Sequence, residues 1–502
     1  MSYWALVEHY RHLSRLRHSE AIIAWDEATM MPVGAGSARA EALSTLRGAI
    51  HREAARDELS GLFSAAATEA KSLQPWQQAN LREMERAWVR ATALPQNLVE
   101  ALSRAESQSE QAWRRLRPAN DFAGFLPLFR EVVRLKREAA QAWSDKLSLS
   151  PYDALLDSFE PGVRAAWIAP LFARLRAFLP GLIEKAMDRQ STAPIAGCDG
   201  FFPEPRQRWL GLEIMRHLGF DFDHGRLDSS HHPFCGGVPS DVRITTRYDL
   251  SDYTKSMMSI LHETGHAKYE QNLPREWRDQ PVGTARGMSI HESQSLFLEM
   301  QVCRSRAFLE FAAPLIAKAF PDMVESNPEA FSPENLFRQL TRISPGLIRV
   351  DADEASYPSH IVLRFELEKG LIDGSLKAED VPEAWNAGMR ELLGLSTCGD
   401  DRNGCMQDVH WPAGMFGYFP TYTLGALTAA QLFQAARRDH PGLLEDIRRG
   451  EFAPLDSWLR ERIWSQGSLL DTPTLVERAT GSALSTTAFE QHLERRYLGQ
   501  ES

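Results

Sequence analysis

Apolar residues recur every three or four positions through most of the first 190 residues, with charged residues between them. The segments 74–93 and 122–147 keep this spacing over their whole length. Such spacing places the apolar side chains on one face of an α-helix. Prolines interrupt the pattern and mark helix starts and stops; they are Pro95, Pro118, Pro151 and Pro161. This part of the chain is therefore predicted to be a succession of amphipathic helices.

The pattern changes near residue 192, where two stretches rich in glycine, proline and serine begin. Residues 192–208 and 224–240 are predicted to be loops, because these residue types favour turns over regular structure. Between the two loops, 206–218 has the spacing of a short helix. Helical spacing returns after residue 250 and continues to the C-terminus.

The segment DVRITTRYDL at 241–250 has the alternation of polar and apolar residues that is typical of a β-strand. The side chains expected on one side are Val242 and Ile244, and those expected on the other are Arg243, Thr245 and Arg247. Since no other stretch alternates so clearly, the chain is predicted to be mainly α, with a small β element.

Composition and charge narrow the classes of protein that fit. The 502 residues are 43% hydrophobic and 25% charged, as in a globular protein. The formal charge of −11, with no compensating basic stretch, argues against a nucleic-acid partner. Five separated cysteines do not form a disulfide framework, and no signal peptide or membrane-spanning stretch is evident. These features predict a cytoplasmic protein without a membrane partner.

The strongest chemical signal is HETGH at 262–266, which has the HExxH pattern. Asp249 or Ser251 can cap the start of a helix that carries it, and Asn272-Leu-Pro274 can end that helix. Residues four apart stack on one helix face, so His262 and His266 can reach the same zinc ion. Glu263 projects beside that ion, where a general base must stand to take a proton from water.

A catalytic zinc site needs a third protein ligand. The extended histidine pattern of metzincins is absent, because Tyr269 and Asn272 occupy its positions. Glu292 stands out among the following carboxylates, because Gly287 and Ser289 mark a helix start just before it. Helix capping would also place a glutamate there, so the residues alone leave the ligand open among Glu270, Glu276, Asp279, Glu292 and Glu299.

Several spaced motifs, taken in their order along the chain, resemble those of the thermostable (Taq-type) carboxypeptidases. They are WDEATMMP at 25–32 followed by Arg39, HPF at 232–234, DVRITT at 241–246, HETGH at 262–266, HESQ at 291–294, IRVDADE at 348–354, GCMQDVHW at 404–411 and GYFPTYTLG at 417–425. The resemblance covers nearly the whole chain and is more specific than HExxH alone.

The resemblance implies an α-rich, neurolysin-like fold with a deep cleft and a homodimeric assembly. It also implies a zinc-dependent carboxypeptidase that releases single C-terminal residues from peptides. The implied specificity is broad, with poor cleavage before a C-terminal proline or acidic residue. One ion per chain is expected, and cobalt suits the same ligands. We expect one catalytic unit over 1–502, in which about 1–190 forms one cleft wall and about 191–502 carries the metal site.

The same resemblance implies residue roles. The ligands become His262, His266 and Glu292, and the base is Glu263. Related helical metallopeptidases supply a tyrosine and a histidine that stabilise the oxyanion of the transition state; the candidates are Tyr422 and His410, with Tyr418 as rival tyrosine.

An arginine suits the free C-terminal carboxylate of the substrate, because its planar fork pairs with a carboxylate through two hydrogen bonds. The resemblance points to Arg349, although Asp351 or Asp353 could instead neutralise it in a structural ion pair. Arg243 is a second candidate, on the strand that precedes the metal helix. Peptidases of this class align the substrate backbone by strand addition at that place.

Two other readings fit the same residues. An oligoendopeptidase on this scaffold would differ only in having a cleft open beyond the residue after the cut. A non-enzymatic, helical zinc-binding scaffold is the third reading, and Glu263 argues against it, because a structural zinc site gains nothing from an unligated carboxylate.

Overall fold

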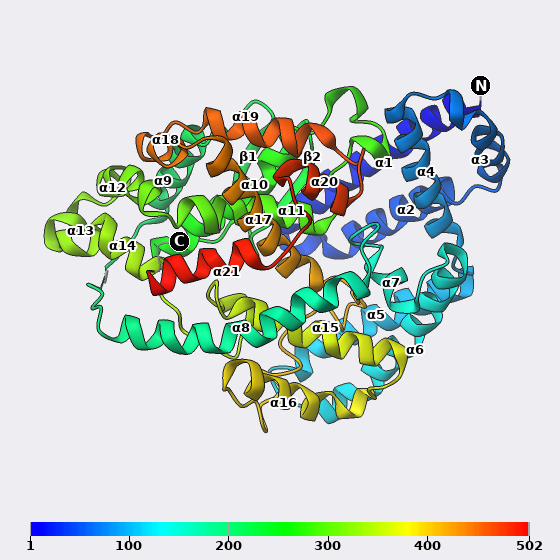
Figure 1. Ribbon diagram of the computed structural model, residues 1–502. Helices are drawn as coiled ribbons and strands as arrows, with labels where there is room; N and C mark the ends of the chain where they lie inside the picture. The colour runs from blue at the N-terminus through cyan, green and yellow to red at the C-terminus, as the bar shows by residue number, and fades with distance from the viewer. Residues whose placement is uncertain (1, 198–199, 500–502) are drawn as a thin grey trace.

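The computed structural model describes residues 2–197 and 200–499, and these are mostly helical (Figure 1). A mainly α fold with a small β element is thereby confirmed. Cys198, one of the five cysteines, lies outside the described residues. The first eight helices are α1 (Ser2–Thr29), α2 (Gly36–Ala54), α3 (Glu58–Glu69), α4 (Pro75–Thr92), α5 (Gln96–Leu116), α6 (Phe122–Leu147), α7 (Pro151–Leu156) and α8 (Ala165–Ser191).

The remaining helices include the metal helix α10, the helix α11 that packs against it, and α17, which packs against α11. They are α9 (Glu204–His217), α10 (Tyr253–Gln271), α11 (Met288–Leu296), α12 (Arg306–Ala319), α13 (Pro321–Ser326), α14 (Pro333–Leu340), α15 (Tyr357–Asp373), α16 (Val381–Leu393), α17 (Pro420–Asp439), α18 (Leu443–Arg449), α19 (Ala453–Arg462), α20 (Thr472–Thr480) and α21 (Thr487–Leu493).

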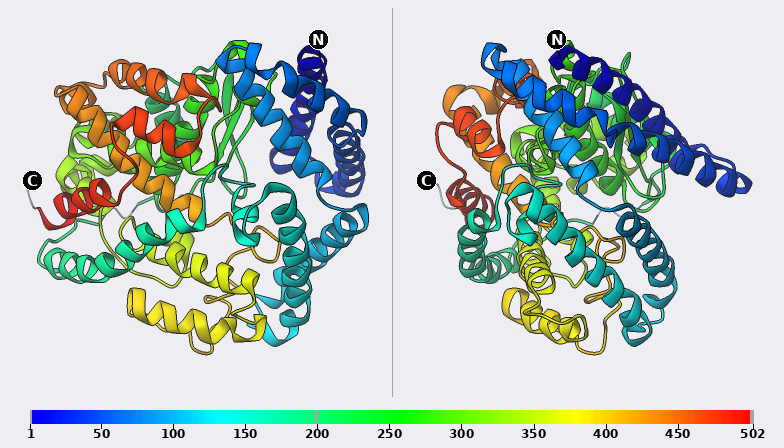
Figure 2. Two further views of the ribbon diagram at one scale, coloured as in Figure 1. Left: turned by 45° about the vertical axis from the view of Figure 1, so that its right-hand side comes forward. Right: turned by 90° about the vertical axis from the view of Figure 1, so that its right-hand side faces the viewer.

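Helices α1–α4 lie together at one end of the molecule and share an apolar core of their own, built from residues such as Leu6, Phe63 and Met84. A second, larger core runs from Leu98 in α5 to Tyr497. Within this core α5 packs on α6, α6 on α15 and α15 on α16, and Figure 2 shows the cyan helices beside the yellow ones. The apolar packing thus changes between α4 and α5, well before residue 190.

Judged by length and composition alone, helix α8 is long and apolar enough to cross a membrane. The sequence reading found no such stretch. The buried side of α8 lies against the large core and carries residues spaced three or four apart, among them Phe172, Leu175 and Leu179. This spacing is that of a helix packed on one side.

The sheet has three strands in the order β1–β3–β2: β1 (Gly225–Ser229), β2 (Cys235–Val238) and β3 (Asp241–Thr246). Strand β1 pairs parallel to β3, and β2 pairs antiparallel to it. The prediction of a loop over 224–240 was therefore wrong, because two short strands lie there without a clear alternation of polarity. A strand was predicted over 241–250 and is found over Asp241–Thr246, with Val242 and Ile244 fully buried as expected.

The position of β3 corrects one further expectation. Both of its edges are occupied by neighbouring strands, so a substrate backbone cannot pair with it. The outer strands are β1 and β2. Strand β2 follows the HPF motif and packs against α1, and no described strand pairs with its outer edge, which is called the open edge of β2 below.

Candidate active site

The helix α10 carries the HETGH motif and packs into the core from its first residue, Tyr253. Its N-cap is Asp252, whose side chain accepts a hydrogen bond from the Thr254 backbone, rather than Asp249 or Ser251. The helix ends at Gln271 with Asn272 as its C-cap, as predicted. His262 and His266 lie on one face, and their rings are 5.0 Å apart between centroids.

Three side chains converge at this face of α10. The Nε2 atoms of His262 and His266 lie 3.8 Å and 3.4 Å from Oε2 of Glu292. One ligand atom from each residue lies within 4.8 Å of the others, close enough to hold one metal ion. Among the described residues this is the one group of its kind, and two histidines with one glutamate can hold a catalytic metal ion.

The other ring nitrogens of the two histidines are already occupied. His262 Nδ1 lies 2.9 Å from Glu299, whose second oxygen accepts a hydrogen bond from Arg304 at 2.7 Å. His266 Nδ1 lies 2.6 Å from His291 Nδ1, and the far nitrogen of His291 lies 2.8 Å from Glu270. These contacts orient both rings so that Nε2 faces the third ligand.

Two of the alternative carboxylates have other contacts. Glu299 binds His262 Nδ1 and Glu270 binds His291, so the geometry distinguishes both from the ligand Glu292. Glu276 and Asp279 do not belong to the group of converging ligand atoms.

Two glycines allow the three helices to approach closely around Glu292. A Cβ on Gly265 of α10 would lie 2.5 Å from the Gln294 carbonyl oxygen of α11. A Cβ on Gly425 of α17 would lie 2.8 Å from Cβ of Glu292 itself. The absence of side chains at these positions brings α11 between α10 and α17 and presents Glu292 to the histidines.

Glu263 lies beside the two histidines and is buried, with 7% of its surface exposed. Burial, opposed by the charge of His262, raises the pKa of the Glu263 carboxyl group to about 7. No described residue donates a hydrogen bond to its carboxylate, so the group is free to meet a water molecule or a substrate.

Facing the metal helix is a wall built from two distant segments, around residues 349–364 and 404–422. A cavity of about 300 Å³ between the two walls is lined by His262, Glu292, Arg349, Tyr357 and Tyr422, among others. His410 Nε2 lies 3.4 Å from the Tyr422 hydroxyl, and the Tyr418 and Tyr422 rings are 5.3 Å apart between centroids. Burial lowers the pKa of His410 to about 4, so the ring is neutral near pH 7.

Arg349 is buried in this wall, but its ion-pair partner is neither of the two predicted aspartates. Its Nη2 and Nε lie 2.8 Å and 3.1 Å from Oδ1 of Asp408, and its Nη1 donates to the Tyr357 hydroxyl at 2.7 Å. Asp353 instead accepts backbone hydrogen bonds from Ser344, Ala355 and Ser356.

Asp408 also serves a second arginine. Its Oδ2 accepts two hydrogen bonds from Arg364, at 2.8 Å and 2.5 Å, and Arg364 is fully buried. Two guanidinium groups therefore share one carboxylate, and one positive charge remains without a counter-charge from this aspartate.

Arg243 lies elsewhere. Its guanidinium pairs with Asp241 through bonds of 2.9 Å and 2.8 Å and stacks on Trp25 of α1 at 4.2 Å. The structure thus joins Arg243 to the WDEATMMP motif instead of to the cavity that Arg349 lines.

Sequence reasoning did not single out four side chains that support the site: Glu299, Asp408, Tyr357 and Glu368. Glu299 was considered only as a possible ligand. Asp408 lies inside the GCMQDVHW motif, in which only His410 was assigned a role. Nothing in the local pattern distinguishes Tyr357, which meets Arg349 eight residues away, or Glu368, whose partners Tyr152 and Trp411 are distant in the chain.

Comparisons with known proteins agree with this geometry. The family described as carboxypeptidase Taq (M32) metallopeptidase matches residues 5–497. Thermostable carboxypeptidase 1 of Thermus thermophilus is 38% identical over 99% of this chain and 98% of the relative. Carboxypeptidase 1 of Bacillus subtilis is 32% identical over 97% and 96% of the two chains.

Solved structures give the same result at the level of the fold. Metallocarboxypeptidase 1 of Trypanosoma cruzi superposes with a TM-score of 0.96 at 42% identity, over 99% of both chains. An M32 carboxypeptidase from Deinococcus radiodurans has a TM-score of 0.93 at 35% identity, over 99% and 98%. These matches confirm the resemblance that the motifs predicted. The chain belongs to the carboxypeptidase Taq (M32) family of metallopeptidases and is a metallocarboxypeptidase.

Proposed function

We propose that this metallocarboxypeptidase holds one zinc ion on His262, His266 and Glu292 and releases single C-terminal residues from peptides. The observation that carries the proposal is the convergence of two Nε2 atoms and one carboxylate oxygen, with both Nδ1 atoms held by other side chains. Two imidazoles and a carboxylate match the ligands that zinc prefers, and cobalt would fit the same donors.

A zinc ion in this position would polarise the scissile carbonyl group and lower the pKa of a water molecule toward 7. Glu263 is the base that takes the proton of that water and transfers it to the departing nitrogen. Its carboxylate is buried, unpaired among the described side chains and one position from His262, which supports this role.

The facing wall supplies donors to the oxyanion that forms when water attacks the carbonyl carbon. Tyr422 lines the cavity with two of the ligands, and its hydroxyl lies beside neutral His410. Tyr418 packs against both rings and remains the rival tyrosine.

Arg349 is the proposed anchor for the C-terminal carboxylate of the substrate. Because Asp408 is shared with Arg364, a substrate carboxylate supplies the missing negative charge in a largely dehydrated cavity. Arg243 is the weaker candidate for this role, since Asp241 already satisfies it on the far side of the sheet.

The cavity also supports broad specificity, because much of its lining is apolar, including Leu296, Met300 and Ala426. Poor release of acidic C-terminal residues is proposed from the resemblance to the family. Poor release of a C-terminal proline belongs to the same proposal.

The test is a digest followed by mass spectrometry, with and without a chelator. We expect residues to leave one at a time from the C-terminus, and the chelator to abolish their release. A matched peptide with an amidated C-terminus separates this activity from an oligoendopeptidase, because efficient cleavage of the amide would contradict the carboxypeptidase proposal. Elemental analysis of the purified protein would show whether zinc is the bound ion.

We also propose that the protein is a cytoplasmic homodimer that acts as one catalytic unit and binds neither nucleic acid nor membranes. The acidic charge of −11 supports the absence of a nucleic-acid partner. Light scattering would test the dimer, and cell fractionation would test the location.

A further inference from the structure

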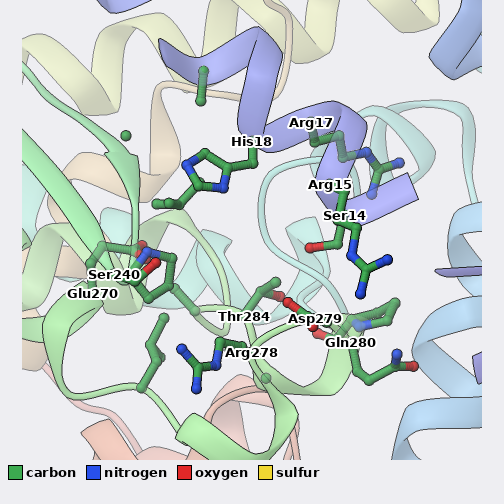
Figure 3. Close-up of a pocket in the computed structure, with 18 of the residues that line it drawn as sticks. Ser14, Arg15, Arg17, His18, Ser240, Glu270, Arg278, Asp279, Gln280 and Thr284 are labelled. Atoms are coloured by element: carbon green, nitrogen blue, oxygen red, sulfur yellow. Dashed lines mark hydrogen bonds between the residues drawn. The ribbon is translucent and has the colours of Figure 1, made fainter. Parts of the chain in front are cut away.

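A second cavity, of about 420 Å³, opens beside the metal site between α1 and the end of the sheet (Figure 3). Its walls come from α1, from the turn that follows β2 and from the segment 278–285. Figure 3 shows Arg15 and His18 on α1 above the hollow, with Glu270 and Arg278 on its other side. Glu270, which contacts His291, lines this space. The other residues placed in the active site do not line it.

The cavity lies at the far end of the metal face of α10. His262, His266 and Glu270 follow one another at four-residue intervals and so share one side of the helix. His262 lines the cavity that contains Arg349, whereas Glu270 lines this second one. His262 and Glu270 are eight positions apart, which is about 12 Å along the helix axis. The ligands His262 and Glu292 line the first cavity, and His266 lies along the helix between it and the second.

A carboxypeptidase needs room for only one residue after the cleaved bond, and Arg349 marks that side in the proposed function. The rest of the peptide must leave the site in the opposite direction. The second cavity is the space that lies there, and so the inference below rests on the proposed function.

The open edge of β2 extends from the metal helix to this cavity. Strand β2, which begins at Cys235, packs against α10. Its other end, with Gly237, Val238 and Ser240, lines the cavity. A peptide that adds to this edge in extended form would run from the cavity toward the metal.

The charge of the cavity lining is unusual for so acidic a chain. Three arginines line it, Arg15, Arg17 and Arg278, and none of them forms an ion pair with a described carboxylate. Of the two carboxylates in the lining, Glu270 is bound to His291 at 2.8 Å and Asp279 stands alone. Guanidinium groups without partners are suited to carboxylates on an incoming peptide.

We propose that this cavity binds the upstream part of the substrate and selects peptides with an acidic side chain about three to five residues before the cleaved bond. These positions follow from distance, because the step of about 12 Å from His262 to Glu270 along α10 equals about four residues of an extended peptide.

The test uses peptides of one length and one C-terminal residue, with glutamate or glutamine placed at each of the six positions before the cleaved bond. We expect kcat/KM to be about two- to fivefold higher for glutamate at one or more of the third to fifth positions. This factor corresponds to the free energy that an exposed ion pair contributes. The preference should fall as salt concentration rises.

Arg15→Gln combined with Arg278→Gln should remove the preference and leave kcat/KM for the glutamine peptides unchanged. Both arginines are exposed and unpaired, so the substitutions are not expected to unfold the protein. Arg104→Gln combined with Arg478→Gln is the matched control, because these two exposed arginines lie on α5 and α20, outside the cavity. The control should keep the preference.

Equal kcat/KM for the two peptide series at every position would overturn the inference, and so would a preference that survives the Arg15 and Arg278 substitutions. Neither result would affect the proposed function, which depends on the release of single residues. Failure to release single residues from any peptide would instead overturn the proposed function.

Discussion

The two walls of the active site are built in different ways. The metal wall comes from α10 and α11, so its ligands and their supporting side chains lie between residues 262 and 304. The facing wall joins segments around 349–364 and 404–422 and depends on contacts across 40 to 60 residues, such as Arg349 to Asp408. We infer that the metal wall governs the chemistry of every substrate and that the facing wall governs which chain end is accepted.

The largest effect is expected on the metal wall, from Glu263→Gln. The amide keeps the shape of the side chain but cannot take a proton, so kcat should fall about 100- to 10,000-fold for every peptide. Elemental analysis should find the metal content unchanged. Glu184→Gln, at an exposed glutamate of α8, is the control and should retain full activity. A Glu263→Gln enzyme with normal turnover would remove this residue as the base.

The next effect concerns Glu368, which supports the facing wall from α15. Its carboxylate accepts hydrogen bonds from Tyr152 at 2.9 Å, from the Trp411 indole at 2.9 Å and from the Gly417 backbone at 3.0 Å. Trp411 and Gly417 flank the loop between His410 and Tyr418, so this one buried group holds both ends of that loop.

Burial raises the pKa of Glu368 from 4.5 to about 7. The folded state then binds its proton more tightly than the unfolded state, and this contribution to stability is full below pH 4.5 and lost as pH rises to about 7. The loss is on the order of 3 kcal/mol at most. Urea unfolding at several pH values should show wild-type stability falling relative to Glu368→Gln over this window. A constant difference between the two proteins would contradict the assignment.

On the same wall, Arg349→Ala should change the choice of substrate more than the chemistry. Loss of a charge-assisted pair with the chain end should raise KM for free C-termini about ten- to a hundredfold. Amidated peptides, which lack that charge, should be affected much less. The ratio of kcat/KM for acid and amide is the measurement, because it does not depend on the fraction of folded enzyme. An equal loss on both would assign the anchor to another residue.

The smallest effect returns to the metal wall. Glu299→Gln weakens the contact that orients His262 and should lower zinc affinity about tenfold, as is usual for groups that support a metal ligand. Competition with a chelator measures the affinity, and kcat at saturating zinc should change much less. Unchanged affinity would show that His262 keeps its orientation without this carboxylate.

The contrast between the walls also explains what could be read from the sequence. The HETGH helix and the mainly α fold follow from local periodicity, because the spacing of residues on one helix decides which side chains meet. The third ligand could not be chosen in that way. Glu270, Glu292 and Glu299 all lie near the histidines, and only the packing of α11 against Gly265 and Gly425 separates the ligand from its neighbours.

Long-range pairing accounts for the expectations that failed. The predicted partners of Arg349 were its neighbours in the chain, but the chain brings Asp408 to it instead. Strands β1 and β2 were missed because their residues, including Gly236 and Gly237, lack alternating polarity and form strands only through pairing with β3.

The open edge of β2 has a consequence for how the protein behaves among other chains. An unpaired strand is a template on which any extended polypeptide, including a second copy, can build a sheet. Here the edge is only Cys235–Val238, and Gly237 adopts a positive φ of 87° that bends it at once. The edge is therefore long enough to pair with a short segment of substrate and too short to start a β-sheet between protein molecules.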